Sequence, residues 1–125
     1  MRLLIDTHVF LWAMGGDKKL SKQAEATLHG ADAVYVSAAS IWEISIKSGL
    51  GKLDADVNEL VTRMGEAGFH ELPVTAVHAA AVRGLPDIHR DPFDRLLVAQ
   101  AMSEPLRLLS DDENVAKYTD LVIRV

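Results

Sequence analysis

Short apolar runs alternate along the whole chain with longer segments in which polar and apolar residues are mixed. The short runs predict five strands: LLID (3–6), AVYVS (33–37), FHELPV (69–74), RLLS (107–110) and LVIRV (121–125). The third run contains Pro73, which cannot donate to a strand ladder, so we expect this strand at an edge of the sheet.

The longer segments predict seven helices, over residues 7–16, 21–30, 39–49, 56–68, 75–84, 93–104 and 112–118. Several of them begin at a capping residue, such as Thr7, Ser21, Asp56 or Thr75, and end at a glycine. Alternating strands and helices are typical of a mostly parallel sheet with helices on both faces. We therefore expect a three-layer α/β/α fold, in a single domain over residues 1–125.

The composition excludes several kinds of site. The chain has 125 residues, of which 49% are hydrophobic and 25% charged, as in an ordinary globular domain. It has no cysteine, which excludes disulfides, zinc–thiolate sites and thiol nucleophiles. No apolar run approaches the roughly 20 residues of a membrane helix, and the N-terminus lacks a signal-peptide pattern. We therefore expect a cytoplasmic protein without a membrane partner.

A carboxylate interrupts the first apolar run. Asp6 ends the predicted strand 3–6, and an ionised carboxylate inside a core is costly unless another group pairs with it. Ligands bind at the carboxyl ends of the strands in a parallel sheet, so Asp6 lies where a site is expected. The alternative is that Asp6 only caps the following helix.

Further acids stand where other strands give way to helices. Glu43 lies in the helix after the second strand, where it is also spaced for an i,i+4 ion pair with Lys47. Asp91 precedes Pro92 and is predicted to be an N-cap, which places Asp94 at the third helical position. Each of these acids therefore has a structural explanation as well as a functional one.

Asp111 and Asp112 follow the strand 107–110, and one of them, or Ser110, is expected to cap the next short helix. The residue pattern does not decide which. Every predicted strand-to-helix switch except the one at Pro73 has an acid at or near it. Carboxylates gathered at one sheet edge repel one another unless a cation pairs with them. Mg²⁺ prefers oxygen ligands, and the five histidines show no paired metal-ligand spacing, so we expect a hard divalent cation.

Four segments together resemble the PIN domain, and more narrowly the VapC-type ribonuclease toxins of bacterial toxin–antitoxin pairs. They are LLIDTHVFLWA, SIWEISIK, HRDPFDRLLVAQA and LLSDDENVAKY. The resemblance covers essentially the whole chain, and HRDPFDRLL is its most distinctive part. It implies a metal site made by four acids: Asp6, Glu43, Asp94 and Asp112. It also implies that Thr7 and Ser110 support this site by hydrogen bonding.

The resemblance further implies an endoribonuclease. Mg²⁺ or Mn²⁺ held by the four acids would activate water for hydrolysis of an RNA phosphodiester bond. The implied partners are RNA, an antitoxin that blocks the active-site groove, and a second copy of the chain in a homodimer. The net charge of −5 argues against a generic, basic nucleic-acid binder. Because the four acids account for −4 of that charge, it does not argue against a metal-anchored nuclease.

Other residues are candidates for contacts with RNA or with a partner protein. Basic residues that flank the four segments either contact phosphates or are ordinary solvated charges: Lys47, Lys52, Arg90 and Arg95. Large apolar residues either form a contact surface or, as expected for most of them, belong to the core: Phe10, Trp12, Met14 and Trp42.

Three other functions fit the same residues less well. A receiver-type phosphoacceptor domain shares the length and an acidic Mg²⁺ pocket, but it needs an aspartate at the end of a middle strand, where this chain has Ser37. A phosphatase of the DxD type needs an acid two positions after Asp6, where this chain has His8. A catalytically silent PIN-like binding module is the remaining alternative, and the intact set of four acids argues against it.

Overall fold

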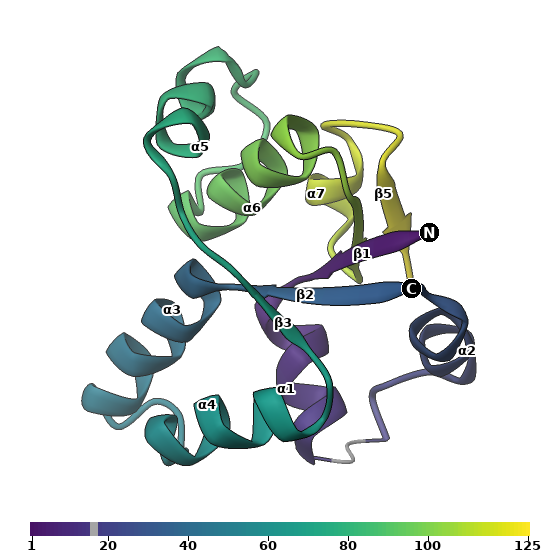
Figure 1. The fold of residues 1–125 in the computed structure, drawn as a ribbon. Coiled ribbons are helices and arrows are strands. Elements are labelled where there is room, and N and C mark those ends of the chain that lie inside the picture. The colour runs from purple at the N-terminus through teal and green to yellow at the C-terminus, as the bar shows by residue number, and fades with distance from the viewer. Residues whose placement is uncertain (16–17) are drawn as a thin grey trace.

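The computed structural model describes residues 1–15 and 18–125, and its central feature is one five-stranded sheet (Figure 1). All strand pairs are parallel, in the spatial order β3-β2-β1-β4-β5. The strands are β1 (Arg2–Ile5), β2 (Ala33–Ser37), β3 (His70–Leu72), β4 (Arg107–Ser110) and β5 (Val122–Arg124). The predicted α/β class with a parallel central sheet is confirmed, and β3 lies at an edge, as expected from Pro73.

Helices connect the strands and cover both faces of the sheet. They are α1 (Thr7–Gly15), α2 (Lys22–Gly30), α3 (Ala38–Gly49), α4 (Val57–Glu66), α5 (Ala76–Ala81), α6 (Pro92–Ser103) and α7 (Glu113–Ala116), with a 3₁₀ turn η1 (Val82–Gly84). In Figure 1, α5, α6 and α7 lie on one side of the sheet and α1, α2 and α4 on the other. This arrangement gives the three predicted layers. Within the described part of the chain, no helix is both long and apolar enough to cross a membrane.

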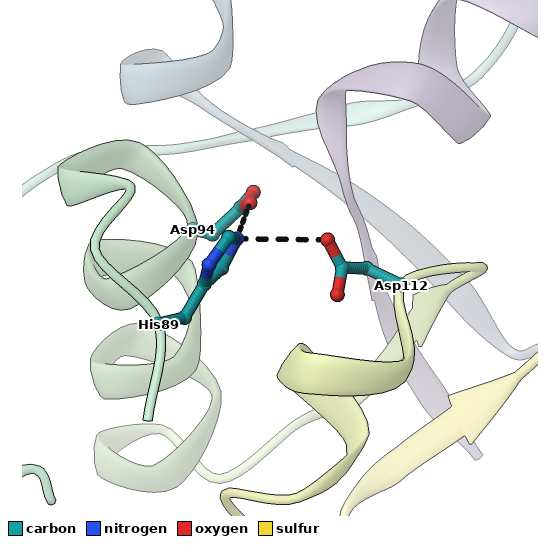
Figure 2. Close-up of side chains that lie close together, drawn as sticks. All are labelled: His89, Asp94 and Asp112. Carbon is teal, nitrogen blue, oxygen red and sulfur yellow. Dashed lines mark hydrogen bonds and ion pairs between the residues drawn. The ribbon is translucent and has the colours of Figure 1, made fainter. Parts of the chain in front are cut away.

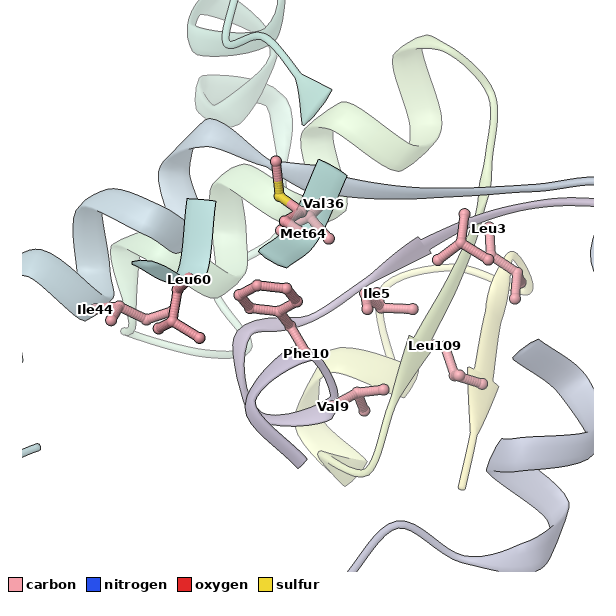
Figure 3. Close-up of a cluster of buried hydrophobic side chains, with 10 residues drawn as sticks. Leu3, Ile5, Val9, Phe10, Val36, Ile44, Leu60, Met64 and Leu109 are labelled. Atoms are coloured by element: carbon pink, nitrogen blue, oxygen red, sulfur yellow. The ribbon is translucent and has the colours of Figure 1, made fainter. Parts of the chain in front are cut away.

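Alternate residues of β1 supply the two halves of the hydrophobic core. Leu3 and Ile5 pack with Phe10 of α1 on one face of the sheet, as Figure 3 shows. Leu4 packs with Leu97 of α6 on the other face. Successive side chains of a strand point to opposite faces, so a central strand that is buried on both sides is apolar at every position. This packing fixes the carboxyl end of β1 between two layers of helices.

The observed helix boundaries follow the predicted ones closely. The helix predicted over residues 75–84 divides into α5 and η1, because the Leu85 N–H bonds to the Val82 carbonyl and tightens the last turn. The helix predicted over residues 7–16 is observed as α1, and position 16 lies outside the described residues. Three predicted N-caps accept a hydrogen bond from a backbone N–H of the first turn, namely Ser21, Asp56 and Thr75.

Candidate metal centre

Two of the predicted site residues, Asp6 and Ser110, meet where the order of strands reverses. From β1 the chain runs outward through β2 and β3, and it then returns to the other side of β1 to form β4 and β5. Parallel sheets bind ligands outside the carboxyl ends of the strands at such a switch. Asp6 follows β1 and Ser110 ends β4, and both residues are buried. The topology thus joins two residues that lie 104 positions apart in the sequence.

Within the described chain, Asp6 is bound by a hydroxyl and a backbone donor rather than by a basic side chain. Its Oδ2 accepts a 2.6 Å hydrogen bond from Ser110 Oγ, and its Oδ1 accepts a 2.9 Å bond from the Val9 N–H. The second bond shows that Asp6 caps α1, which is the structural alternative considered for this residue, while Thr7 is the first helical residue. Burial raises the pKa of the Asp6 carboxyl, although both hydrogen bonds oppose this shift. The two hydrogen bonds therefore do not fully offset the effect of burial on the pKa of Asp6.

Glu43 forms a second buried cluster at the same edge of the sheet. Thr7 Oγ1 lies 2.7 Å from Glu43 Oε1 and 3.0 Å from Ser40 Oγ. Since a carboxylate only accepts, the Thr7 hydroxyl donates to Glu43 and accepts from Ser40. Lys47 Nζ lies 2.8 Å from Glu43 Oε2, which is the i,i+4 pair expected from the sequence. The pKa of Lys47 is raised, mainly by this bond and to a smaller extent by more distant carboxylates that include Asp94.

The start of α6 positions Asp94. As predicted, Asp91 is the N-cap, Pro92 takes the first helical position, and the Asp94 N–H donates to Asp91 Oδ1 at 3.0 Å. The pKa of the Asp94 carboxyl is raised to about 6, first by burial and then by the negative charge of Asp91, while a hydrogen bond with His89 opposes the shift. Asp6 contributes to the same rise, so these two predicted ligands lie within each other's field.

Asp112 both caps α7 and faces the predicted site. The sequence expects one of the two neighbouring acids, Asp111 or Asp112, to face the site while another residue caps the helix. Its Oδ1 accepts hydrogen bonds from the N–H groups of Asn114 (2.7 Å) and Val115 (3.2 Å), so Asp112 is the N-cap of α7. Its Oδ2 lies 3.5 Å from His89 Nε2. Asp111 instead lines a hollow formed with residues of α1 and α2. The structure thus turns Asp112, and not Asp111, toward the start of α6.

His89 lies between two of the predicted acids, as Figure 2 shows. Its Nε2 is 3.0 Å from Asp94 Oδ2 and 3.5 Å from Asp112 Oδ2. Each of the three residues offers one ligand atom, and these atoms all lie within 4.8 Å of one another. The sequence does not single out His89 as a site residue, because no second histidine lies at a metal-ligand spacing from it. The available signal was its place five residues before Asp94.

Within the described residues, the group of possible metal-ligand atoms contains two of the four predicted acids. Asp94 and Asp112 belong to it together with His89. Asp6 and Glu43 lie outside this group, with their oxygens held by the hydroxyl, backbone and lysine donors described above. The role of all four acids as ligands of one metal site stays a prediction.

Arg95 holds the loop that carries His89. Its guanidinium donates to the carbonyl oxygens of Pro86 (3.0 Å) and Val82 (3.4 Å) and to the Tyr118 hydroxyl (3.1 Å). Because these bonds engage both terminal nitrogens of the guanidinium, they favour a structural role for Arg95 over the phosphate contact considered from the sequence.

The other predicted surface residues divide into two sets. Three are exposed, and these are Lys52, Arg90 and Trp42, with 60% of Trp42 accessible to solvent. Three lie in or against the hydrophobic core, and these are Phe10, Trp12 and Met14. Among the large apolar candidates, Trp42 is therefore the one best placed for contact with another molecule.

Comparison with known proteins identifies the family of this chain. The PIN domain family model matches residues 3–121. Ribonuclease VapC22 of Mycobacterium tuberculosis is 25% identical over 119 residues, which cover 93% of this chain and 91% of the relative. The family match over residues 3–121 therefore runs from within β1 to beyond the end of α7 and includes every predicted site residue.

Solved structures share the fold at lower sequence identity. VapBC2 from Rickettsia felis, bound to a DNA fragment, superposes with a TM-score of 0.70 at 12% identity, covering 100% of this chain and 98% of that one. FitAcB from Neisseria gonorrhoeae gives 0.69 at 20% identity, covering 98% and 96%. A toxin–antitoxin complex from Klebsiella pneumoniae gives 0.68 at 17% identity, covering 97% and 95%. The resemblance found in the sequence is confirmed, and the chain belongs to the PIN domain family.

Proposed function

We propose that this protein is a metal-dependent endoribonuclease and the toxin of a toxin–antitoxin pair. The observation that carries the proposal is the meeting of Asp94, Asp112 and His89 at the strand-order switch of a PIN domain, beside the buried Asp6. The similarity to a protein named as a ribonuclease supports the class of reaction. The match to the PIN domain over residues 3–121 does not favour a receiver-type domain.

The donor groups at this edge fit a divalent cation. Carboxylate oxygens are the ligands that Mg²⁺ and Mn²⁺ prefer. Burial, together with neighbouring acids, raises the pKa values of Asp6 and Asp94, and a bound cation would reverse this shift. We assign the metal to Asp6, Glu43, Asp94 and Asp112. When bound, Mg²⁺ or Mn²⁺ supplies an activated water and neutralises charge on the phosphate.

Two hydroxyl groups position these acids. Ser110 Oγ donates to Asp6 Oδ2 and accepts from the Asp112 N–H at 3.1 Å, so it links the ends of β1 and β4 to the start of α7. Thr7 orients Glu43 in the same way from the first turn of α1. Both hydroxyls are buried, which keeps water from competing for these bonds. In this proposal Ser110 and Thr7 are positioning residues and the acids bind the metal.

The antitoxin is the proposed occupant of an apolar surface on α3. Trp42, Ile46 and Leu50 are 60%, 39% and 64% exposed, and their spacing of four residues places them on one side of the helix. Trp42 lies edge-on to Phe93, 5.2 Å between ring centroids, beside a hollow of 280 Å³ at the start of α6. A protein bound there would lie next to Glu43 and Asp94, and one structural neighbour of this chain is a toxin–antitoxin complex. Trp42→Ser should weaken antitoxin binding in a calorimetric titration.

Three further assignments rest on the sequence. We propose that residues 1–125 form one domain, that the protein acts in the cytoplasm, and that it forms a homodimer. Light scattering of the purified chain at several concentrations tests the last of these, since a mass equal to that of the monomer at all concentrations contradicts it.

Cleavage of total cellular RNA by the purified chain tests the proposed activity. We expect discrete fragments with Mg²⁺ or Mn²⁺, none with EDTA, and none with Asp94→Asn. Asp87→Asn is the matched control, because Asp87 is an exposed acid of the same loop, and it should cleave like the wild type. A preparation free of antitoxin that binds Mn²⁺ but cuts no RNA would instead indicate the catalytically silent module.

A further inference from the structure

The backbone on both sides of His89 is fixed, although the residue lies in a loop. The His89 N–H donates to the Tyr118 hydroxyl at 2.8 Å. The His89 carbonyl accepts from the same hydroxyl at 3.3 Å and from Arg95 Nη1 at 3.4 Å. Tyr118 lies in the segment after α7 and Arg95 in α6, so the loop is tied to both helices that carry the acids. These backbone bonds place the His89 side chain beside the starts of α6 and α7.

The two acids that face His89 each keep an oxygen available to it. Asp112 uses Oδ1 to cap α7, which directs Oδ2 toward the His89 ring. Asp94 is oriented by the bond from its own N–H to the Asp91 cap, and its Oδ2 faces the same ring nitrogen. Helix capping thus directs the Asp112 carboxylate and fixes the backbone from which the Asp94 side chain extends.

The spacing of the three atoms suits a shared metal ion at least as well as a hydrogen bond donated by the imidazole. A single ring N–H can be directed at only one of two carboxylates, which lie 3.0 and 3.5 Å away. A cation placed between the three atoms contacts all of them. With metal–ligand bonds of about 2.1 Å, neighbouring ligand atoms are separated by about 3.0 Å in an octahedral site and about 3.4 Å in a tetrahedral one. The two distances from His89 Nε2 to the carboxylate oxygens, 3.0 and 3.5 Å, lie close to these values.

We propose that His89 is itself a metal ligand, through Nε2, and that this nitrogen makes the site prefer Mn²⁺ over Mg²⁺. The inference rests on the proposed metal-dependent function and adds to it a ligand that is not one of the four acids. Mg²⁺ favours oxygen ligands and retains several waters, whereas imidazole nitrogen suits first-row transition ions. A nitrogen donor therefore contributes more to the affinity for Mn²⁺ than to the affinity for Mg²⁺.

Electron spin echo spectroscopy of Mn²⁺ bound to the protein tests this ligand directly. We expect the modulation of a directly bound imidazole nitrogen, which changes to the ¹⁵N pattern when the protein is made with ¹⁵N-labelled histidine. The signal should be lost in His89→Gln and retained in the matched control His29→Gln, since His29 is an exposed histidine of α2. The experiment on the labelled wild type does not depend on the folding of any variant.

Calorimetric titrations with Mn²⁺ and Mg²⁺ test the preference. His89→Gln should weaken Mn²⁺ binding by about tenfold or more, and Mg²⁺ binding by about threefold or less. Bound Mn²⁺ without a nitrogen signal, a signal that survives in His89→Gln, or an equal loss for both ions would overturn the proposal while leaving the four-acid site in place. A wild type that binds no Mn²⁺ at all would overturn the proposed metal dependence as well.

Discussion

Replacing Asp94 by asparagine measures how far an ionised carboxylate at this position lowers the free energy of unfolding of the metal-free protein. The pKa of Asp94 is about 6 in the folded protein, against 3.8 for an unperturbed aspartate. Each pKa unit corresponds to about 1.36 kcal/mol, so ionised Asp94 costs the metal-free protein up to about 3 kcal/mol. Asparagine has the same shape, can still accept a hydrogen bond from His89, and carries no charge. Asp94→Asn should therefore raise the free energy of unfolding by about 1–3 kcal/mol at pH 8, since 23% of the Asp94 side chain remains exposed and solvent screens part of the cost.

The pH dependence of this gain follows from the direction of the pKa shift. The folded state holds the Asp94 proton more tightly than the unfolded chain does, so the wild type loses stability as the pH rises from about 4 to about 6. The variant lacks this titration. The difference between the two proteins should be complete above about pH 7, fall to about half at pH 5, and vanish below the unfolded pKa.

Urea unfolding at pH 5 and pH 8 in the presence of EDTA, followed by tryptophan fluorescence, tests the size of the gain in stability and its pH dependence. Asp87→Asn provides the control, because neutralising an exposed acid should change stability by no more than about 0.5 kcal/mol. Saturating Mn²⁺ should stabilise the wild type more than Asp94→Asn, because only the wild type retains the ligand. A variant that is no more stable than the wild type at pH 8, or equally stabilised at both pH values, would refute the reasoning.

Three further variants test the residues around the site. Ser110→Ala removes the donor to the buried Asp6 and should lower the free energy of unfolding by about 1–3 kcal/mol in urea, and an unchanged value would contradict the role of this bond. Arg95→Leu releases the loop before α6, so amide hydrogen exchange over residues 85–90 should accelerate, whereas unchanged protection would show that Arg95 does not hold the loop. Trp42→Ser changes an exposed side chain and should leave stability within about 0.5 kcal/mol, and a larger loss would place Trp42 in the core instead.

Structural features that depend on residues close together in the chain could be predicted from the sequence. The Asp91 cap with Pro92 at the first helical position and the Thr75 cap of α5 are observed where predicted, because capping depends on hydrogen bonds between residues three apart. The alternation of apolar runs with helical segments likewise predicts the fold class, since it dictates parallel strands joined by helices. At the start of α1 the sequence offers two adjacent caps, Asp6 and Thr7, and the structure selects Asp6.

The sequence by itself determined the elements, their order and the acids at their ends. Only the tertiary structure decided which of these acids meet. Asp6 and Ser110 are 104 positions apart and touch because β1 and β4 are neighbours in the sheet. His89 stands between Asp94 and Asp112 because α6 and α7 start at the same edge and Arg95 fixes the intervening loop. The physical reason is that strand order and loop position are set by packing of the whole core, which no local pattern of residues encodes.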